Sequence, residues 1–181
     1  AMINSVNGKQ SSMNEVFPLV QKYGGVVVCL CLDENGIPET AKGRIAIAEK
    51  IIKTAESYGI DKKDLVVDAL VMTISTNKDN AKETLKAVEY IRHELGVGTV
   101  LGVSNISFGL PKREAINTAF FTLALKAGLS AGIINPLSES MMNAYYSYNA
   151  LEGFDDNCTE YIESVTQSAN NNASSGVTDL K

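Results

Sequence analysis

The chain has 181 residues and a mass of 19.4 kDa, with 45% apolar and 20% charged side chains. This is the composition of a globular protein, and the length suits one domain. Lysine and arginine number 16 against 21 for aspartate and glutamate, so the net charge is −5 and a nucleic-acid or anionic-lipid surface is not expected. Neither a membrane-spanning apolar run nor a signal-peptide pattern is present, and we expect a cytoplasmic protein.

Cysteine and histidine are scarce in this sequence. Three cysteines, Cys29, Cys31 and Cys158, are too few and too unevenly spaced for a disulfide framework or a four-ligand zinc site. Cys29 and Cys31 lie two apart in an apolar run, which predicts buried, reduced thiols that pack in the core. With His93 as the one histidine, we expect no metal site, and chemistry that rests on carboxylates and amides.

Short apolar runs alternate with longer segments of helical period along the chain. This order predicts βα units around a parallel sheet. The runs are nearly continuous in Val, Ile and Leu, as in strands that are covered on both faces. The predicted strands are Met2–Ile3, Val26–Leu32, Leu65–Val71, Thr99–Ser104 and Ala131–Ile134.

The predicted helices end at glycines, which permit the left-handed turn into the next strand. The first begins near a capping-box pair, Ser12 and Glu15, and stops at Gly24. The later ones are Arg44–Tyr58, Ala81–Leu95, Ala115–Ala127 and Ser138–Ala150. We place a domain at residues 1–165 and predict that 166–181, rich in Asn, Ser and Ala, form a flexible linker.

Polar side chains follow the predicted strands at the points where they end. They are Asn4, Asp33, Asp68, Asn105 and Asn135. The carboxyl ends of parallel strands meet at one edge of a sheet, so these positions predict one pocket. Asp33 lies in a segment of turn residues and fits a solvated turn better.

Asp68 stands inside the run LVVDALV, where an unpaired charge would be costly to bury. A functional carboxylate is favoured over one that only accepts backbone N–H bonds, because no Lys or Arg lies in the run. For Asn105, a pocket residue and a simple turn-former are equally good interpretations of the sequence.

The segments MINSVN, LVVDAL and LGVSNISFGLPKR, with the following AINTAFF, closely resemble the pterin-binding methyltransferases. This family includes the folate-binding domain of cobalamin-dependent methionine synthase, and the resemblance, which runs from Ala1 to about Glu163, is to the C-terminal part of that domain. The segment after it is similar to a linker towards a cobalamin-binding module.

The resemblance implies a (β/α)₈ TIM barrel, of which this chain supplies about the last five βα units. The N-terminal part of the barrel, with some of the pterin ligands, is absent from this sequence. A partial barrel leaves sheet edges open, so we expect the missing part, or a second copy in a homodimer, to pair with them.

The resemblance also implies roles for individual residues. Asn4 and Asp68 correspond to residues that bind the pterin edge, and Asn105 to the catalytic asparagine beside the ring nitrogen that bears the methyl group. Gly102 and Ser104 would line the pterin pocket, and Arg113 would reach the aminobenzoyl-glutamate tail. The implied reaction transfers a methyl group from methyltetrahydrofolate to a corrinoid, cobalamin, carried by another domain or protein, during methionine synthesis from homocysteine.

Two alternatives remain open at this point. One is a dihydropteroate synthase-like condensation on the same scaffold, although Asn135–Pro136 lacks the basic residues which that family carries there. The other is a non-catalytic piece that docks a cobalamin domain.

Overall fold

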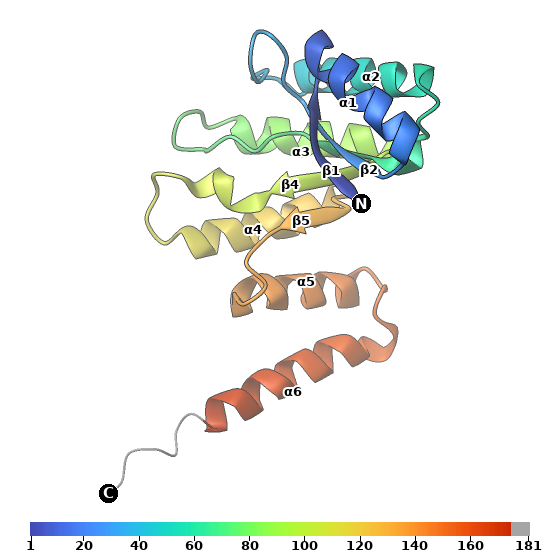
Figure 1. Ribbon diagram of the computed structural model, residues 1–181. Helices are drawn as coiled ribbons and strands as arrows, with labels where there is room; N and C mark the ends of the chain where they lie inside the picture. The colour runs from blue at the N-terminus through green and yellow to red at the C-terminus, as the bar shows by residue number, and fades with distance from the viewer. Residues whose placement is uncertain (175–181) are drawn as a thin grey trace, which may run out of the picture. The chain divides into compact units, whose positions relative to one another are not determined.

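The computed structural model describes residues 1–174, and the side chains as far as residue 166. Residues Ala1–Ile134 form the first of two compact units. Its five strands are all parallel and lie in the order β1-β2-β3-β4-β5 (Figure 1). They are β1 (Met2–Asn7), β2 (Val26–Leu30), β3 (Leu65–Asp68), β4 (Gly98–Gly102) and β5 (Ala131–Ile133).

A helix follows each of the first four strands, as the alternating pattern predicts. These helices are α1 (Gln10–Tyr23), α2 (Ala41–Ser57), α3 (Asn80–His93) and α4 (Arg113–Lys126). Gly24 follows α1 with φ 70°, and Gly59 lies just beyond α2 with φ 73°, so the glycine stops are confirmed. The capping-box start is wrong: α1 begins at Gln10, and the Ser12 hydroxyl accepts the N–H of Asn7.

The two faces of the sheet are buried to different degrees. Alternate residues of the three central strands have no exposed surface, and these face the helices. They are Val27, Cys29, Leu65, Val67, Thr99 and Leu101. The opposite face carries Asp68, Val100 and Gly102, so Asp68 is a carboxylate among apolar neighbours on the face away from the helices.

Strand β1 is longer than predicted and places Asn4 differently. It runs to Asn7, with a register shift between Asn4 and Val6, so Asn4 lies within the strand rather than at its end. The physical reason is Val6, which is fully buried and continues the strand beyond the polar pair Asn4–Ser5. Strand β3 is shorter than predicted and stops at Asp68.

Residues Asn135–Lys181 form the second compact unit. It contains α5 (Glu139–Leu151), capped by Ser138, and α6 (Thr159–Ser174). The Asp155 carboxylate accepts the N–H groups of Glu160 and Tyr161 and so caps α6. The predicted linker is therefore helical as far as Ser174, and residues 175–181 lie outside the described part of the chain. Among the helices of residues 1–174, none has both the length and the hydropathy of a membrane span.

Candidate functional site

Asp68 ends β3 and is 9% exposed. One carboxylate oxygen, Oδ1, accepts the N–H of Leu70 at 2.8 Å. Among the residues that the structure describes, no donor contacts Oδ2 and no cation forms an ion pair with the carboxylate. Burial raises the pKa of Asp68 from 3.8 to about 6, while the Leu70 N–H and the positive charge of Arg44 act in the opposite direction.

Asn105 lies in η2 (Val103–Ser107), the short 3₁₀ segment that follows β4. Its side-chain nitrogen sits 3.1 Å from the point where a Cβ on residue 102 would stand, so glycine at 102 leaves the space that the amide occupies. The amide forms no hydrogen bond with the described residues. The amide is half-exposed, so its donors and acceptor are open to water or a ligand.

Asp68, Gly102 and Asn105 line one cavity of about 320 Å³, hereafter the Asp68 cavity. Its apolar walls include Leu70 and Phe108. The volume falls in the range of small-molecule sites, and the lining combines apolar walls with a few convergent polar groups. Of the polar strand-end residues that the sequence singles out, Asp68 and Asn105 line this cavity together.

The loops that carry Asp68 and Asn105 are bonded to each other. Thr73, in the loop after β3, donates its hydroxyl to the carbonyl of Phe108 at 2.7 Å, and Ser75 does so at 2.8 Å. The N–H of Ile74 donates to the carbonyl of Ile106 at 3.0 Å. These contacts fix the separation between the carboxylate and the amide before any ligand arrives.

Arg113, predicted to reach a ligand tail, is engaged within the protein. Its Nε donates to the Ser107 hydroxyl at 2.9 Å and its Nη2 to the Ser104 carbonyl at 2.8 Å, while its guanidinium lies over the Phe108 ring. Arg113 therefore braces the segment that holds Asn105. Ser104 contributes a carbonyl to this brace, and its own side chain is exposed and does not line the Asp68 cavity.

Asn4 shares a face of the sheet with Asp68 but lies at its edge. It pairs with Val28 of β2, which pairs with Val66 of β3, so Asn4 stands one side-chain row before Asp68. Asn4 is exposed and does not line the Asp68 cavity.

The two remaining strand-end residues form turns. Asp33 accepts the N–H of Asn35, as predicted for a turn, and Asn135 accepts the N–H of Leu137. That Asn135 joins the pocket stays a prediction. Cys29 and Cys31 are fully buried, which confirms their place in the core, and burial raises the pKa of Cys29 to about 12.

Sequence reasoning missed Arg44, the largest fully buried side chain of the protein's described part. A signal was present: Arg44 falls on the apolar stripe of α2, at helical spacing from the buried Ala41, Ala48 and Ile51. A charge on the buried face of a helix requires partners inside the protein.

This fold is that of a pterin-binding enzyme. Residues 1–135 match the family model described as pterin binding enzyme, and the chain belongs to that family. A solved dihydropteroate synthase from Xanthomonas albilineans, in complex with 7,8-dihydropteroate, is similar at a TM-score of 0.62 and 20% identity, over 83% of this chain and 59% of that one. This likeness confirms the fold class, α/β of the TIM-barrel type, here with five strands.

Among curated relatives, a methylcorrinoid:tetrahydrofolate methyltransferase of Eubacterium limosum is 29% identical over 171 residues, which cover 92% of this chain and 62% of the relative. The methionine synthases of Mycobacterium tuberculosis and Mycobacterium leprae are 34% and 35% identical, over 78% and 74% of this chain. The chain spans only 13% and 12% of those two proteins. The relatives thus share a class, methyltransferases.

Proposed function

We propose that the chain binds the pterin ring of methyltetrahydrofolate in the Asp68 cavity and promotes transfer of the N5 methyl group to the cobalt of a corrinoid. The observation that carries the proposal is the Asp68 carboxylate, whose Oδ2 has no partner among the described residues and which lines the same cavity as Asn105. A corrinoid-dependent reaction is supported by the name of one relative, the methylcorrinoid:tetrahydrofolate methyltransferase. The corrinoid would arrive on another domain or protein, and methionine synthesis would consume the methyl group.

Asp68 is suited to the amino-pyrimidinone edge of a pterin, which presents neighbouring N–H donors. A carboxylate accepts such donors in pairs, and these charge-assisted bonds are the stronger kind. The bond from Leu70 occupies Oδ1 from the side of the backbone and orients the group, while Oδ2 remains available. The raised pKa leaves most of the carboxylate ionised at neutral pH.

Asn105 is suited to the ring nitrogen that carries the methyl group. When the carbon–nitrogen bond breaks, the electron pair stays on nitrogen, which must gain a proton or a hydrogen bond. An amide that stabilises this nitrogen mainly in the transition state raises the rate more than the ground-state affinity. Transfer in the opposite direction passes through the same transition state, so the same residue serves both directions.

We also propose that further βα units preceding β1, for which the length of the methylcorrinoid:tetrahydrofolate methyltransferase leaves room, complete the barrel and its pterin ligands. The outer edges of β1 and β5 pair with no strand that the structure describes. Asn4 would then face the pterin from the completed wall rather than from an exposed edge.

The test is a transfer assay with methyltetrahydrofolate and reduced cob(I)alamin, in which methylcobalamin formation is followed by absorbance. The chain should form methylcobalamin, alone or when supplied with the preceding barrel units, and Asn105→Ala should slow transfer strongly while folate still binds. Asn14→Ala, an exposed change on α1, is the matched control. Folate binding with no transfer in either form would indicate a docking module and contradict the enzyme proposal.

A further inference from the structure

Arg44 of α2 joins three segments at the carboxyl end of the sheet. Its Nε donates to the carbonyl of Pro38, in the loop after β2, at 2.9 Å. Its Nη1 donates to the carbonyl of Leu70, in the loop after β3, at 3.0 Å, and to the hydroxyl of Thr84 on α3 at 2.6 Å. Loss of this side chain would remove its bonds to both loops and to α3.

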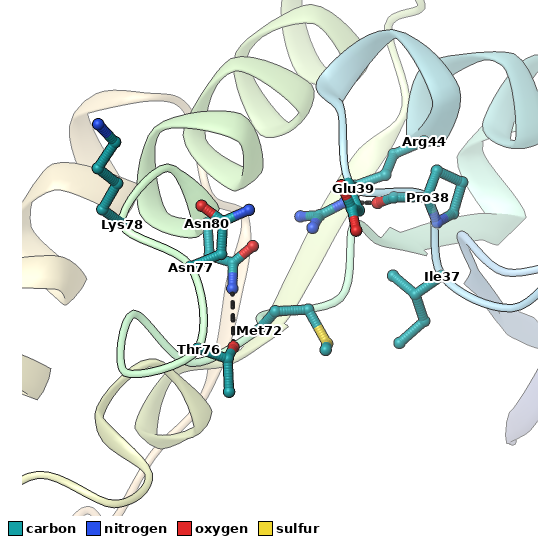
Figure 2. Close-up of a pocket in the computed structure, with 9 residues that line it drawn as sticks. All are labelled: Ile37, Pro38, Glu39, Arg44, Met72, Thr76, Asn77, Lys78 and Asn80. Atoms are coloured by element: carbon teal, nitrogen blue, oxygen red, sulfur yellow. Dashed lines mark hydrogen bonds between the residues drawn. The ribbon is translucent and has the colours of Figure 1, made fainter.

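Arg44 also stands at the wall of a second cavity, of about 570 Å³, between the loops after β2 and β3 (Figure 2). The residue nevertheless exposes no surface, and its Nη2 is buried without a partner in the described part of the chain. A ligand in that cavity therefore cannot contact the guanidinium unless neighbouring side chains move. The contribution of Arg44 has to pass through the groups that it already bonds.

Leu70 connects Arg44 to the Asp68 cavity. Its carbonyl accepts from Arg44, and its N–H donates to Oδ1 of Asp68 at 2.8 Å. Leu70 has φ 61°, in the left-handed region that side chains other than glycine seldom adopt, so its conformation must be held from outside. The bond from Arg44 holds this residue where its N–H meets the carboxylate.

Of the charged groups around Asp68, Arg44 is the cation that stabilises the ionised carboxylate. From the residue just after β2, the Cys31 N–H donates to the Asp68 carbonyl at 3.0 Å, and burial raises the pKa of the Cys31 thiol, which stays protonated. From α3, the Glu83 carboxylate interacts with Arg44. Its two oxygens accept hydrogen bonds from the Ala41 N–H and from the Lys86 ammonium. Arg44 is thus the positive charge, within the residues described, that favours the ionised form of Asp68.

We propose that Arg44 is a positioning residue: through its bond to the Leu70 carbonyl and through its positive charge, it holds the Asp68 carboxylate in place at the wall of the Asp68 cavity. This inference builds on the proposed pterin site, but its central statement concerns the ligand-free protein. Arg44 touches no substrate in this account. It acts only on the residue that does.

The test is a pH titration of the ligand-free full chain by nuclear magnetic resonance, which follows the Asp68 carboxyl carbon and the Arg44 Nε. Both signals should change with one midpoint near pH 6, while exposed Arg92 should not respond. Arg44→Met should raise the Asp68 midpoint by about one pH unit, and Arg44→Lys, which keeps the charge, should restore most of it. Arg92→Met is the matched control and should leave the midpoint in place.

An unchanged Asp68 midpoint in Arg44→Met would overturn the proposal. If that variant does not fold, the titration of the unmodified chain still tests the proposal. An Arg44 Nε signal that does not change with the midpoint of Asp68 would also overturn the proposal. Folate binding by Arg44→Met should weaken at pH 7 and recover at higher pH, which a purely structural loss would not do. Failure of the unmodified chain to bind folate would count against the pterin site alone, since the titration needs no ligand.

Discussion

Similar polar residues lie at the centre and at the edge of this sheet, but their surroundings differ. Asp68 and Asn105 follow neighbouring inner strands, and cross-bonded loops hold both around one cavity. Asn4 lies on the outermost strand β1, exposed and without a side-chain hydrogen bond in the described residues. A polar residue at a strand end contributes to a binding site when the strands on both sides of it carry loops that form a cavity and bond to each other.

Asp68→Asn should weaken methyltetrahydrofolate binding by about 100-fold or more, because the pterin donors lose a charged acceptor. The fold should persist, since an amide oxygen can still accept the Leu70 N–H. Calorimetric titration measures the affinity. Asp61→Asn, at an exposed position, should bind like the unmodified chain.

Asn105→Ala should lower the transfer rate by about 100-fold and change the folate Kd much less. The reason is that the amide acts on a nitrogen whose charge develops only during transfer. Single-turnover kinetics separate the two quantities. Equal losses in rate and affinity would show instead that Asn105 is mainly a binding residue.

Folate binding should fall as the pH drops below about 6, by about tenfold for each pH unit, because the protonated Asp68 cannot accept both donors.

The free energy of unfolding should change with pH in the opposite direction. The pKa of Asp68 is higher in the folded state, so folding takes up a proton between about pH 4 and 6 and stability falls as the pH rises through that window.

A rise in pKa from 3.8 to about 6 corresponds to about 3 kcal/mol, at 1.36 kcal/mol for each unit. Asp68→Asn should remove this pH dependence from the free energy of unfolding, which urea titrations at several pH values would measure. A dependence that persists in Asp68→Asn would assign it to another group.

Gly102→Ala should slow transfer by about tenfold. The added Cβ would lie 3.1 Å from the Asn105 side-chain nitrogen and would push the amide aside by a few tenths of an ångström. Gly98→Ala on the same strand is the control, because its Cβ would meet nothing closer than 3.6 Å. If both variants lose the same activity, crowding at Asn105 is not the cause.

Asn4→Ala should change folate binding by less than about threefold in this chain, because the side chain is exposed and outside the Asp68 cavity. The same change should matter more once the preceding units enclose β1. Comparison of the two forms by calorimetry checks this. A large loss in this chain alone would mean that the edge already takes part in binding.

Much of the fold was predictable because it depends on local patterns. Apolar runs and glycine stops gave the order of strands and helices, and the charge inside LVVDALV marked Asp68 as exceptional. The extension of β1 depends on one buried residue, Val6, which a run of polar neighbours obscures. The parts that escaped prediction depend on tertiary contacts between segments distant in sequence.

Arg44 and Thr73 illustrate that limit. An arginine in a helix and a threonine in a loop are ordinary surface residues by composition. Their importance comes from bonds to the carbonyls of Leu70 and Phe108, which lie 26 and 35 positions further along the chain. Similarly, the sequence offered Arg113 as a ligand contact, and only its bonds to Ser104 and Ser107 show that it braces η2.

The most direct test of the central claim is a calorimetric titration with methyltetrahydrofolate at pH 7.5, of the unmodified chain and of Asp68→Asn, each alone and with the preceding barrel units. The account predicts that folate binds the unmodified protein in at least the completed form and that the substitution abolishes most of the affinity. Equal affinity for the two, or no binding in either form, would contradict a pterin site built on Asp68.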